Sequence, residues 1–395
     1  MTDVVIAGLG QTPVGEHWDI SLRELALQAI DAARLDAGGL QPQALFVGNM
    51  LAPQLSGQAH LGALIADYAG LASIEAAAIE AAGASGGAAL RAGYLTVASG
   101  QVDVALIVGV EKITDQIGAS VDSALATSAD NDYEAVQGLT PASQAALLMR
   151  RYLYEFDAPR AAFAGFPLTA HANGACNPNA MFQKAISLDA YNRAGMLSDP
   201  LNMFDVAPNA DGAAALILAR RELLPPDFPH PLVRIAGSGV ATDTLALHDR
   251  PAPLDLQAAR LSVERACRKA RITPLQVDFF ELYDVFSIYA ALSLEAAGFA
   301  ERGQGWRLAQ DGGSQGDSHP APISLHGSLP ISTLGGLKAR GNPGGATGVY
   351  QAVEAVLQLR GQAGQNQVPN ARRALLQCLG GPASTAVAHV LEIVD

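Results

Sequence analysis

The chain has 395 residues, of which 49% are hydrophobic and only 16% are charged. This length predicts about two to three domains, and the apolar fraction provides an ample core, so the composition excludes a disordered or fibrous protein. Lys and Arg number 25 against 38 Asp and Glu, which gives a formal net charge of −13. A phosphate backbone would be repelled by this charge, so nucleic acid is not an expected partner.

The cysteines and the N-terminus indicate the cellular compartment. Cys176, Cys267 and Cys378 form no C-x-x-C pair, which argues against a disulfide framework and a zinc ribbon and favours a reducing compartment. The N-terminal apolar run is short and follows Asp3, so neither a signal peptide nor an anchor is expected. No segment approaches the roughly 20 apolar residues of a membrane span. We therefore expect a cytoplasmic protein with no membrane association and no metal site.

The first part of the chain alternates strands with helices. Residues 4–7 form an apolar strand that ends at Gly8-Leu9-Gly10, and residues 21–24 form a capping box that begins a helix. The two glycines admit a dinucleotide-binding interpretation, but Pro13 falls where the required helix should begin and the third glycine is missing. Further apolar strands at 44–50 and 102–111, with helical segments between them, predict an α/β domain with a covered sheet.

The middle of the chain changes character before a second α/β segment begins. Residues 114–200 are more polar and predict an inserted, mostly helical lobe; residues 211–218 return to a small-residue strand, and residues 223–231 form a proline-rich linker. A loop rich in Gly, Ser, His and Pro spans 303–330. The order of glycine-rich turn, helix, spacer and apolar strand at 83–111 recurs at 341–394, which indicates an internal duplication.

Four segments carry residues suited to chemistry. The small-residue turn at 79–87 leads into a helix, so its exposed N–H groups favour an anion. It also matches G-x-S-x-G, which makes Ser85 a candidate nucleophile of a serine hydrolase; glycines present only for close helix packing are the alternative. The other three segments are Glu281-Leu282-Tyr283-Asp284-Val285-Phe286, the glycine-dense run 334–348, and Cys378-Leu379-Gly380-Gly381.

In this order, the segments resemble the thiolase superfamily over essentially the whole chain. The similarity includes VDVALIVGVEKIT (102–114), HANGACNPNA (171–180), APNADGAAALIL (207–218), ELYDVFS, GGLKARGNPGGATG and CLGG. The pattern is most similar to the sterol-carrier-protein-type and archaeal acetyl-CoA acetyltransferase branch. This resemblance implies an α/β thiolase fold, with two similar αβα halves in a five-layer αβαβα arrangement, a mixed five-stranded sheet in each half, and an inserted helical lobe.

The resemblance also shows which catalytic positions differ. Claisen enzymes of the family carry a nucleophilic cysteine at a helix N-terminus, which lowers the thiol pKa; Gly83 occupies that position here. Asn342 matches the histidine of the G-H-P motif, Tyr283 matches the histidine of H-D-C-F, and Val285 matches its cysteine. Only Cys378 agrees with an expected reactive residue, the acid/base cysteine of C-x-G. Ordinary covalent thiolase chemistry is therefore not expected.

The remaining groups suggest an enolate site. Asn342 offers an amide NH2, Tyr283 a phenol beside Asp284, and the backbone near Gly83 and Gly380 offers N–H groups for an oxyanion. With Tyr283 or Cys378 as proton carrier, an aldol or retro-aldol step next to a CoA thioester needs no acyl-enzyme. Aldolases that resemble this branch lack the cysteine and use tyrosines. A catalytically inactive acyl-CoA-binding or scaffold protein is the alternative, and a serine hydrolase using Ser85 is a more distant one.

The resemblance also predicts domains and partners. We expect an N-terminal half at 1–120 plus 200–225, a lobe at 121–199 and a C-terminal half at 230–395. A coenzyme A thioester is the expected substrate or ligand, with no covalently bound cofactor. A homodimer or dimer of dimers is implied, and a small OB-fold, zinc-ribbon protein is a possible partner. The lobe cations are candidate contacts for the CoA phosphates, although solvated surface charges are the simpler interpretation: Arg150, Arg151, Arg160 and Lys184.

Overall fold

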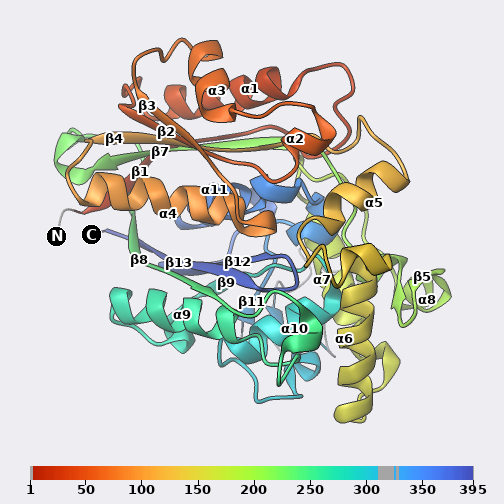
Figure 1. Ribbon diagram of the computed structural model, residues 1–395. Helices are drawn as coiled ribbons and strands as arrows, with labels where there is room; N and C mark the ends of the chain where they lie inside the picture. Colours follow the sequence, from red (N-terminus) through yellow and green to blue (C-terminus); the bar gives the residue numbers. More distant parts are fainter. Residues whose placement is uncertain (1–2, 310–323, 326–328, 395) are drawn as a thin grey trace.

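The computed structural model describes residues 3–309, 324–325 and 329–394. Most of the loop predicted at 303–330 therefore lies outside the described residues. Nine strands are joined edge to edge by hydrogen bonds. In the middle of this array, β1 (Val4–Gln11) and β8 (Val233–Thr242) are paired through two residue pairs only, Val5 with Arg234 and Ile6 with Val233. Beyond this short junction, the strands form the two sheet layers seen in Figure 1.

The N-terminal sheet has five strands and is covered on its outer face by helices. Its strands, in spatial order, are β3 (Glu75–Ile79), β2 (Ala44–Gly48), β4 (Val104–Glu111), β7 (Gly212–Arg220) and β1 (Val4–Gln11). The outer helices are α1 (Leu22–Asp36) and α3 (Leu61–Tyr68), while the short α2 (Ala52–Leu55) follows β2. The predicted capping box is present, because Ser21 and Glu24 each bond the other's backbone N–H.

The C-terminal sheet has four strands among the described residues, rather than the expected five. They are β8 (Val233–Thr242), β13 (Thr385–Ile393), β12 (Arg373–Gly380) and β9 (Phe279–Glu281). Beyond β9 the chain makes only an isolated bridge between Phe280 and Ile331, so no fifth strand forms there within the described ranges. Two-residue strands β10 (Ser324–Leu325) and β11 (Leu329–Pro330) pair with each other instead. Helices α9 (Gln257–Ala270) and α10 (Ser287–Ala296) cover the outer face.

Two helices lie between the sheet layers, α4 (Ser85–Ala98), which is partly exposed, and α11 (Thr347–Leu359), which is almost entirely buried. Both follow the glycine-rich turns that suggested a duplication. Glycine is required where they approach each other, since a Cβ on Gly348 would stand 2.2 Å from the backbone nitrogen of Gly87. One apolar cluster joins residues of both helices and both sheets. The expected five-layer αβαβα arrangement is therefore confirmed.

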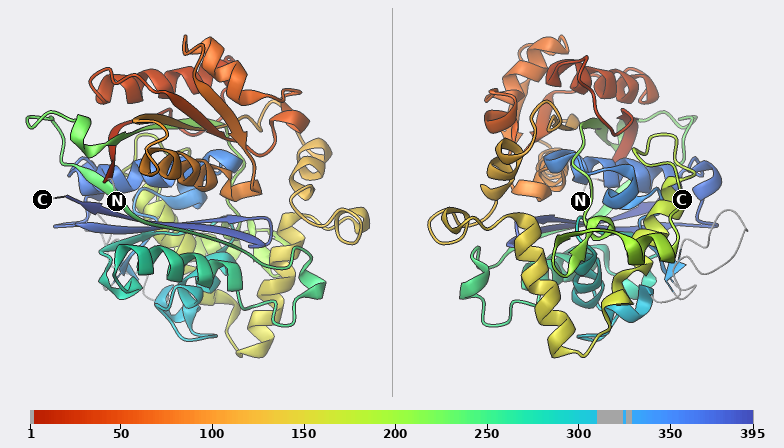
Figure 2. Two further views of the ribbon diagram at one scale, coloured as in Figure 1. Left: turned by 60° about the vertical axis from the view of Figure 1, so that its left-hand side comes forward. Right: turned by 90° about the vertical axis from the view of Figure 1, so that its right-hand side faces the viewer.

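The inserted lobe packs beside these layers and is mostly helical, as predicted. Figure 2 shows its helices beside the ends of the strands. A two-stranded hairpin is added to the helices. The lobe elements are α5 (Ala119–Ala126), α6 (Pro141–Glu155), α7 (Gly165–Gly174), α8 (Leu188–Arg193), β5 (Met196–Ser198) and β6 (Leu201–Asn202).

Candidate active site

A cleft of about 160 Å³ lies where the turns before α4 and α11 meet the lobe. Both halves and the lobe contribute to its walls, and most of its surface is apolar. Three of the sequence-predicted site residues, Gly83, Tyr283 and Asn342, come together here. The remaining lining residues are Met50, Asp122, Leu125, Ser128, Thr140, Pro141, Ala142, Leu197, Val206, Ala207, Asn209, Val285, Phe286, Tyr289, Gly344, Leu379 and Gly381.

The Tyr283 phenol fills the space that a side chain at residue 83 would need. Gly83 lies in the 3-10 turn Ala82–Ala84 that leads into α4. A Cβ on Gly83 would lie 2.0 Å from the Tyr283 hydroxyl oxygen and 2.7 Å from the carbonyl oxygen of Leu379. Real Cβ atoms do not approach so closely, so a side chain at 83 and the present position of Tyr283 exclude each other. The phenol fills the position from which a nucleophilic side chain at residue 83 would extend.

The Tyr283 phenol is a neutral hydrogen-bond donor. The side chain is 5% exposed, and burial raises the pKa of the phenol, with Cys378, Tyr289 and Asp284 adding to the rise and Arg340 opposing it. Its hydroxyl has no hydrogen-bond partner within the described ranges, yet it faces the cleft. It is therefore available to a ligand.

Asn342 is fixed in the wall of the cleft by its backbone and by one side-chain bond. Its N–H donates to Pro208, and its carbonyl accepts from the N–H of Ala210 at 3.1 Å. The side-chain Oδ1 accepts from Thr347 Oγ1 at 3.3 Å. Since Oδ1 is already engaged, the NH2 group is the part of this amide that a ligand can use.

Cys378 lies behind the cleft wall rather than on its surface. The thiol is 1% exposed and donates to Gln351 Oε1 at 3.0 Å. Burial raises its pKa to about 12, although a backbone hydrogen bond from Gly87 and the charge of Arg340 oppose the rise. Cys378 acts on Tyr283 electrostatically but does not line the cleft. The Cys378 thiol therefore lies next to the Tyr283 phenol, and its proton is already used in the hydrogen bond to Gln351.

Asp284 and Gly380 also lie behind the wall. Asp284 accepts from the Leu337 N–H at 2.7 Å and from the Ser332 hydroxyl at 3.2 Å, so it fixes the turn that precedes Asn342. Burial raises the pKa of this carboxyl. Gly380 is required for packing, because a Cβ there would stand 2.3 Å from the Ala81 carbonyl oxygen. Its neighbour Gly381 lines the cleft in its place.

Ser85 is not placed as a nucleophile. Its side chain is fully buried, donates to the Ala82 carbonyl at 2.6 Å and accepts from the Ala81 N–H at 2.9 Å. These bonds shape the turn, and Ser85 does not line the cleft. The serine-hydrolase interpretation therefore lacks structural support. The alternative, in which the glycines of this turn are present for close helix packing, fits the observed contacts.

The lobe cations are not among the residues that line the cleft. Arg150 pairs with Asp199 and Arg151 with Glu155, and all four of these side chains are partly or largely exposed. Arg160 donates to the Pro200 carbonyl. None of these arginines, nor Lys184, lines the cleft, and their contact with the CoA phosphates stays a prediction.

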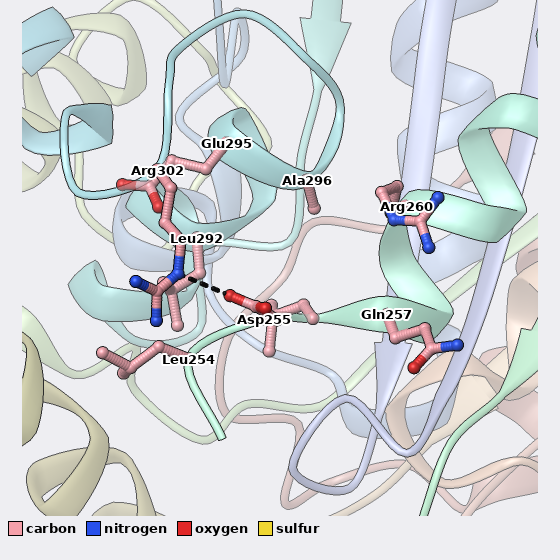
Figure 3. Close-up of a pocket in the computed structure, with 9 residues that line it drawn as sticks. Leu254, Asp255, Gln257, Arg260, Leu292, Glu295, Ala296 and Arg302 are labelled. Atoms are coloured by element: carbon pink, nitrogen blue, oxygen red, sulfur yellow. Dashed lines mark hydrogen bonds and ion pairs between the residues drawn. The ribbon is translucent and has the colours of Figure 1, made fainter. Parts of the chain in front are cut away.

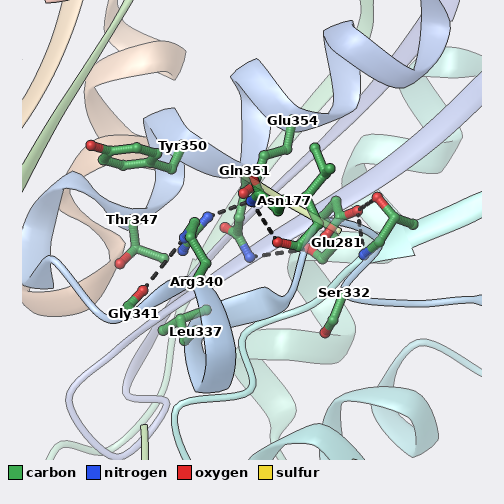
Figure 4. Close-up of polar contacts among 12 residues, drawn as sticks. Asn177, Glu281, Ser332, Leu337, Arg340, Gly341, Thr347, Tyr350, Gln351 and Glu354 are labelled. Carbon is green, nitrogen blue, oxygen red and sulfur yellow. Dashed lines mark hydrogen bonds and ion pairs between the residues drawn. The ribbon is translucent and has the colours of Figure 1, made fainter. Parts of the chain in front are cut away.

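A buried polar network supports the floor beneath the cleft (Figure 4). Arg340 Nη1 pairs with Glu354 Oε2 at 2.7 Å, and both side chains are buried. Gln351 Nε2 donates to the carbonyls of Leu282 and Gln377, which ties the Tyr283 turn to the strand that carries Cys378. The same side chain accepts the thiol proton. Sequence reasoning missed Gln351, because it lies in the interior of a helix with no motif around it.

Glu111 and Tyr289 were also missed. Glu111 accepts from the N–H groups of Met50, Leu51 and Gly345, so one carboxylate holds backbone from both halves beside the cleft. Burial raises its pKa to about 7, although these bonds oppose the rise. A carboxylate that ends a fully apolar strand was a signal in the sequence. Tyr289 lines the cleft six residues beyond Tyr283 and carried no comparable signal.

A second hollow, of about 340 Å³, lies between α9 and α10 on the outer surface. Figure 3 shows that the ion pair between Arg302 and Asp255, at 2.8 Å, crosses it. It contains none of the predicted site residues. Over the described ranges, no group of three or more His, Cys, Asp or Glu side chains could hold a metal ion, and no helix is long and apolar enough to cross a membrane.

The duplicated five-layer fold, with a cleft at the turns before its two central helices, defines a protein of the thiolase fold. Residues 4–222 match the family described as "Thiolase, N-terminal domain", and residues 239–393 match "Thiolase C-terminal domain-like". The chain belongs to the thiolase family, as the sequence resemblance predicted.

Relatives place the chain in the predicted branch of this family. It is 40% identical over 394 residues to an acetyl-CoA acetyltransferase of Methanothermobacter thermautotrophicus, covering 99% of this chain and 100% of that protein. It is 30% identical over 308 residues to sterol carrier protein 2 of Bos taurus, covering 75% of this chain and 55% of that protein. The solved Ltp2-ChsH2(DUF35) aldolase shares the fold with a TM-score of 0.83 and 23% identity, covering 99% and 98% of the two chains.

Proposed function

We propose that this protein makes or breaks the carbon–carbon bond next to an acyl-CoA thioester by an aldol or retro-aldol route. The observation that carries the proposal is the overlap of Tyr283 with the space above Gly83. A site without a nucleophilic side chain at this position cannot form the acyl-enzyme of Claisen chemistry. An enolate route needs hydrogen-bond donors for an oxyanion and a proton carrier.

The cleft supplies such groups. The NH2 of Asn342 and the phenol of Tyr283 are neutral donors in a largely apolar setting, where an oxyanion gains more from a hydrogen bond than it does in water. Tyr283 is favoured as the proton carrier over Cys378, because the thiol is already bonded to Gln351 and does not reach the cleft. The solved aldolase with the same fold supports the assignment of this reaction type by analogy.

The test is the cleavage of β-hydroxyacyl-CoA thioesters by the protein and by two variants. Tyr283→Phe should lower kcat/KM by about 10²- to 10⁴-fold, the usual contribution of a general acid or base. Cys378→Ala should lower it much less. Tyr154→Phe changes a largely exposed tyrosine and serves as the matched control. If the unmodified protein binds CoA but cleaves none of these thioesters, the enzymatic proposal is wrong.

A catalytically inactive acyl-CoA-binding protein is the second candidate. It is favoured by the simultaneous absence of the nucleophile and of both histidines at Gly83, Asn342 and Tyr283. Such a protein would keep the cleft and the CoA affinity without turnover. The thioester assay above separates the two candidates directly.

We also infer acyl-CoA as the ligand, a homodimer or dimer of dimers, and a cytoplasmic location. The free cysteines Cys176, Cys267 and Cys378 support the reducing compartment. A small OB-fold, zinc-ribbon partner is supported by the solved complex titled Ltp2-ChsH2(DUF35) aldolase. Light scattering coupled to size-exclusion chromatography, with and without such a partner, measures both assembly states.

A further inference from the structure

Asn209 lies in the wall of the cleft and has an unused side-chain amide. It belongs to the sequence APNADGAAALIL (207–218), and its side chain is exposed to solvent at the cleft. This side chain makes no hydrogen bond to another residue that the structure describes. The amide is therefore available to a ligand that enters the cleft, and its removal would break no contact of the fold.

Asn209 and Asn342 lie side by side on neighbouring segments. The two residues form an isolated parallel bridge. The Asn342 N–H donates to the Pro208 carbonyl at 2.9 Å, and the Asn342 carbonyl accepts from the Ala210 N–H at 3.1 Å, so the register is fixed on both sides of Asn209. Residues paired in this way project their side chains to the same face. Both side chains line the cleft, in agreement with this pairing.

The spacing of the pair lets both amides reach one oxygen atom. Paired strands lie about 4.8 Å apart, and the two asparagine side chains have the same length. An oxygen that accepts from two N–H groups at about 2.9 Å each requires the two nitrogens to lie within about 6 Å of each other. Two asparagines in register satisfy this requirement without any change in the backbone.

The segment that carries Asn209 is held at three points. Before Asn209, the Ala207 N–H donates to the Val285 carbonyl at 2.8 Å. After it, the buried Asp211 carboxylate accepts from the Ile113 N–H at 2.7 Å. The parallel bridge is the third point. Donors on such a fixed segment need little reorganisation when charge develops on an oxygen, which is the property that an oxyanion hole requires.

The cleft offers few other side-chain donors. The residues that line it include one carboxylate, Asp122, and no Lys, Arg or His within the described ranges, so a negative charge on a ligand must be met by neutral groups. The Ser128 hydroxyl already donates to a backbone carbonyl at 2.8 Å, and the Thr140 hydroxyl is used in the capping box of α6. The amides of Asn209 and Asn342 therefore remain, together with the phenols of the cleft.

We propose that Asn209 is a further catalytic residue, whose NH2 group donates, together with that of Asn342, to the carbonyl oxygen of the CoA thioester. This inference rests on the proposed function and deepens it, because the pair forms the oxyanion hole in which the enolate charge develops. It adds no bond-making step, since both amides keep their protons and only donate hydrogen bonds. The group that Asn209 recognises is the thioester oxygen itself, which a CoA thioether lacks.

The first test measures binding without turnover. Butyryl-CoA carries the thioester oxygen, whereas S-butyl-CoA has a CH2 group in place of the carbonyl and is otherwise the same, so calorimetry of both ligands isolates the contact with this oxygen. The unmodified protein should bind butyryl-CoA more tightly than S-butyl-CoA. Asn209→Ala should reduce this preference about three- to tenfold, the usual contribution of one hydrogen bond, and leave the affinity for S-butyl-CoA within about twofold.

The second test measures the cleavage of a β-hydroxyacyl-CoA thioester. Asn209→Ala should lower kcat by about 10²- to 10³-fold and change KM by less than about tenfold, because the hydrogen bond strengthens as the oxygen becomes charged. Asn209→Asp keeps the size of the side chain but replaces the NH2 group by a carboxylate oxygen, so it should lower kcat at least as far. A purely structural role predicts that Asp is tolerated better than Ala. Asn192→Ala changes an exposed asparagine of the lobe and serves as the matched control.

The outcomes distinguish this inference from the proposed function. Equal affinity of the unmodified protein for the two ligands, or an equal loss of both affinities in Asn209→Ala, shows that Asn209 does not bind the thioester oxygen and overturns the inference. Cleavage by Asn209→Ala within about threefold of the unmodified rate overturns it as well. If the unmodified protein cleaves no β-hydroxyacyl-CoA while its preference for the thioester still depends on Asn209, the proposed function is wrong and the binding of the thioester oxygen by Asn209 stands.

Discussion

The Tyr283 hydroxyl oxygen lies 2.0 Å from the point where a Cβ on Gly83 would stand. The absence of a nucleophilic side chain at residue 83 and the presence of a tyrosine at residue 283 therefore depend on each other. A cysteine at 83 would have to displace the phenol, and the phenol can occupy its place only above a glycine. Restoring one position of the family pattern without the other is therefore not expected to restore Claisen activity.

The first prediction concerns the stability of this pair. Gly83→Ala should lower the free energy of unfolding by about 1–3 kcal/mol, the usual result of overpacking a buried site. In a Tyr283→Ala background, the same change should cost clearly less, with a coupling of about 1 kcal/mol or more. Urea denaturation measures all four proteins. Gly195→Ala, where a Cβ would meet nothing within 4 Å, is the control and should change little.

The second prediction concerns Ser85. No acyl adduct should form on Ser85 when the protein is incubated with acyl-CoA, because its hydroxyl is fully buried and bonded within the turn. Peptide mass spectrometry after rapid acid quenching detects such an adduct. An acylated Ser85 would restore the serine-nucleophile interpretation and contradict the enolate route.

The third prediction concerns Cys378. Burial raises its pKa to about 12, so below pH 8 the thiol stays protonated and reacts slowly with iodoacetamide in the folded protein. The partly exposed Cys176 should be alkylated much faster, and unfolding in urea should remove the difference. Mass spectrometry of the two peptides gives both rates. Similar rates in the folded state would show that the thiol is accessible after all.

The fourth prediction concerns Lys338, which is buried and donates to the Asp205 carbonyl at 2.7 Å. Burial lowers the pKa of its ammonium group to about 8, although Asp284 and Asp205 oppose the fall. Between pH 8 and about 10.5 the unfolded chain therefore binds more protons at this residue than the folded protein, so its contribution to stability rises with pH. Any stability gained by Lys338→Met at pH 7.5 should shrink at pH 9.5. The exposed Lys184→Met should show no such change.

The local structure was predictable because it depends on nearby residues. The capping box at Ser21, the apolar strand at 102–111 and the glycine turns before both central helices are visible in the sequence and present in the structure. The four-stranded C-terminal sheet was not predicted, since the count came from family resemblance.

The side-chain pairings of the site were less predictable, because they join distant segments. Cys378 bonds Gln351, Asp284 bonds the turn at Leu337, and Glu111 bonds Gly345 across the two halves. No periodicity in the sequence encodes such partners; they follow from how the layers pack. The cleft position of Tyr289 became evident only once α10 was placed.

The lobe contributes Thr140, Pro141 and Leu197 to the cleft, although the core layers carry Gly83, Tyr283 and Asn342. Under the proposed function, the part of the protein that holds the reacting groups and the part that borders the acyl group are therefore separate segments of the chain. Substrate preference can therefore diverge among relatives through changes in the lobe alone, while the buried network beneath the cleft stays intact. Exchanging the lobe between two such proteins should transfer acyl preference without transferring the reaction type.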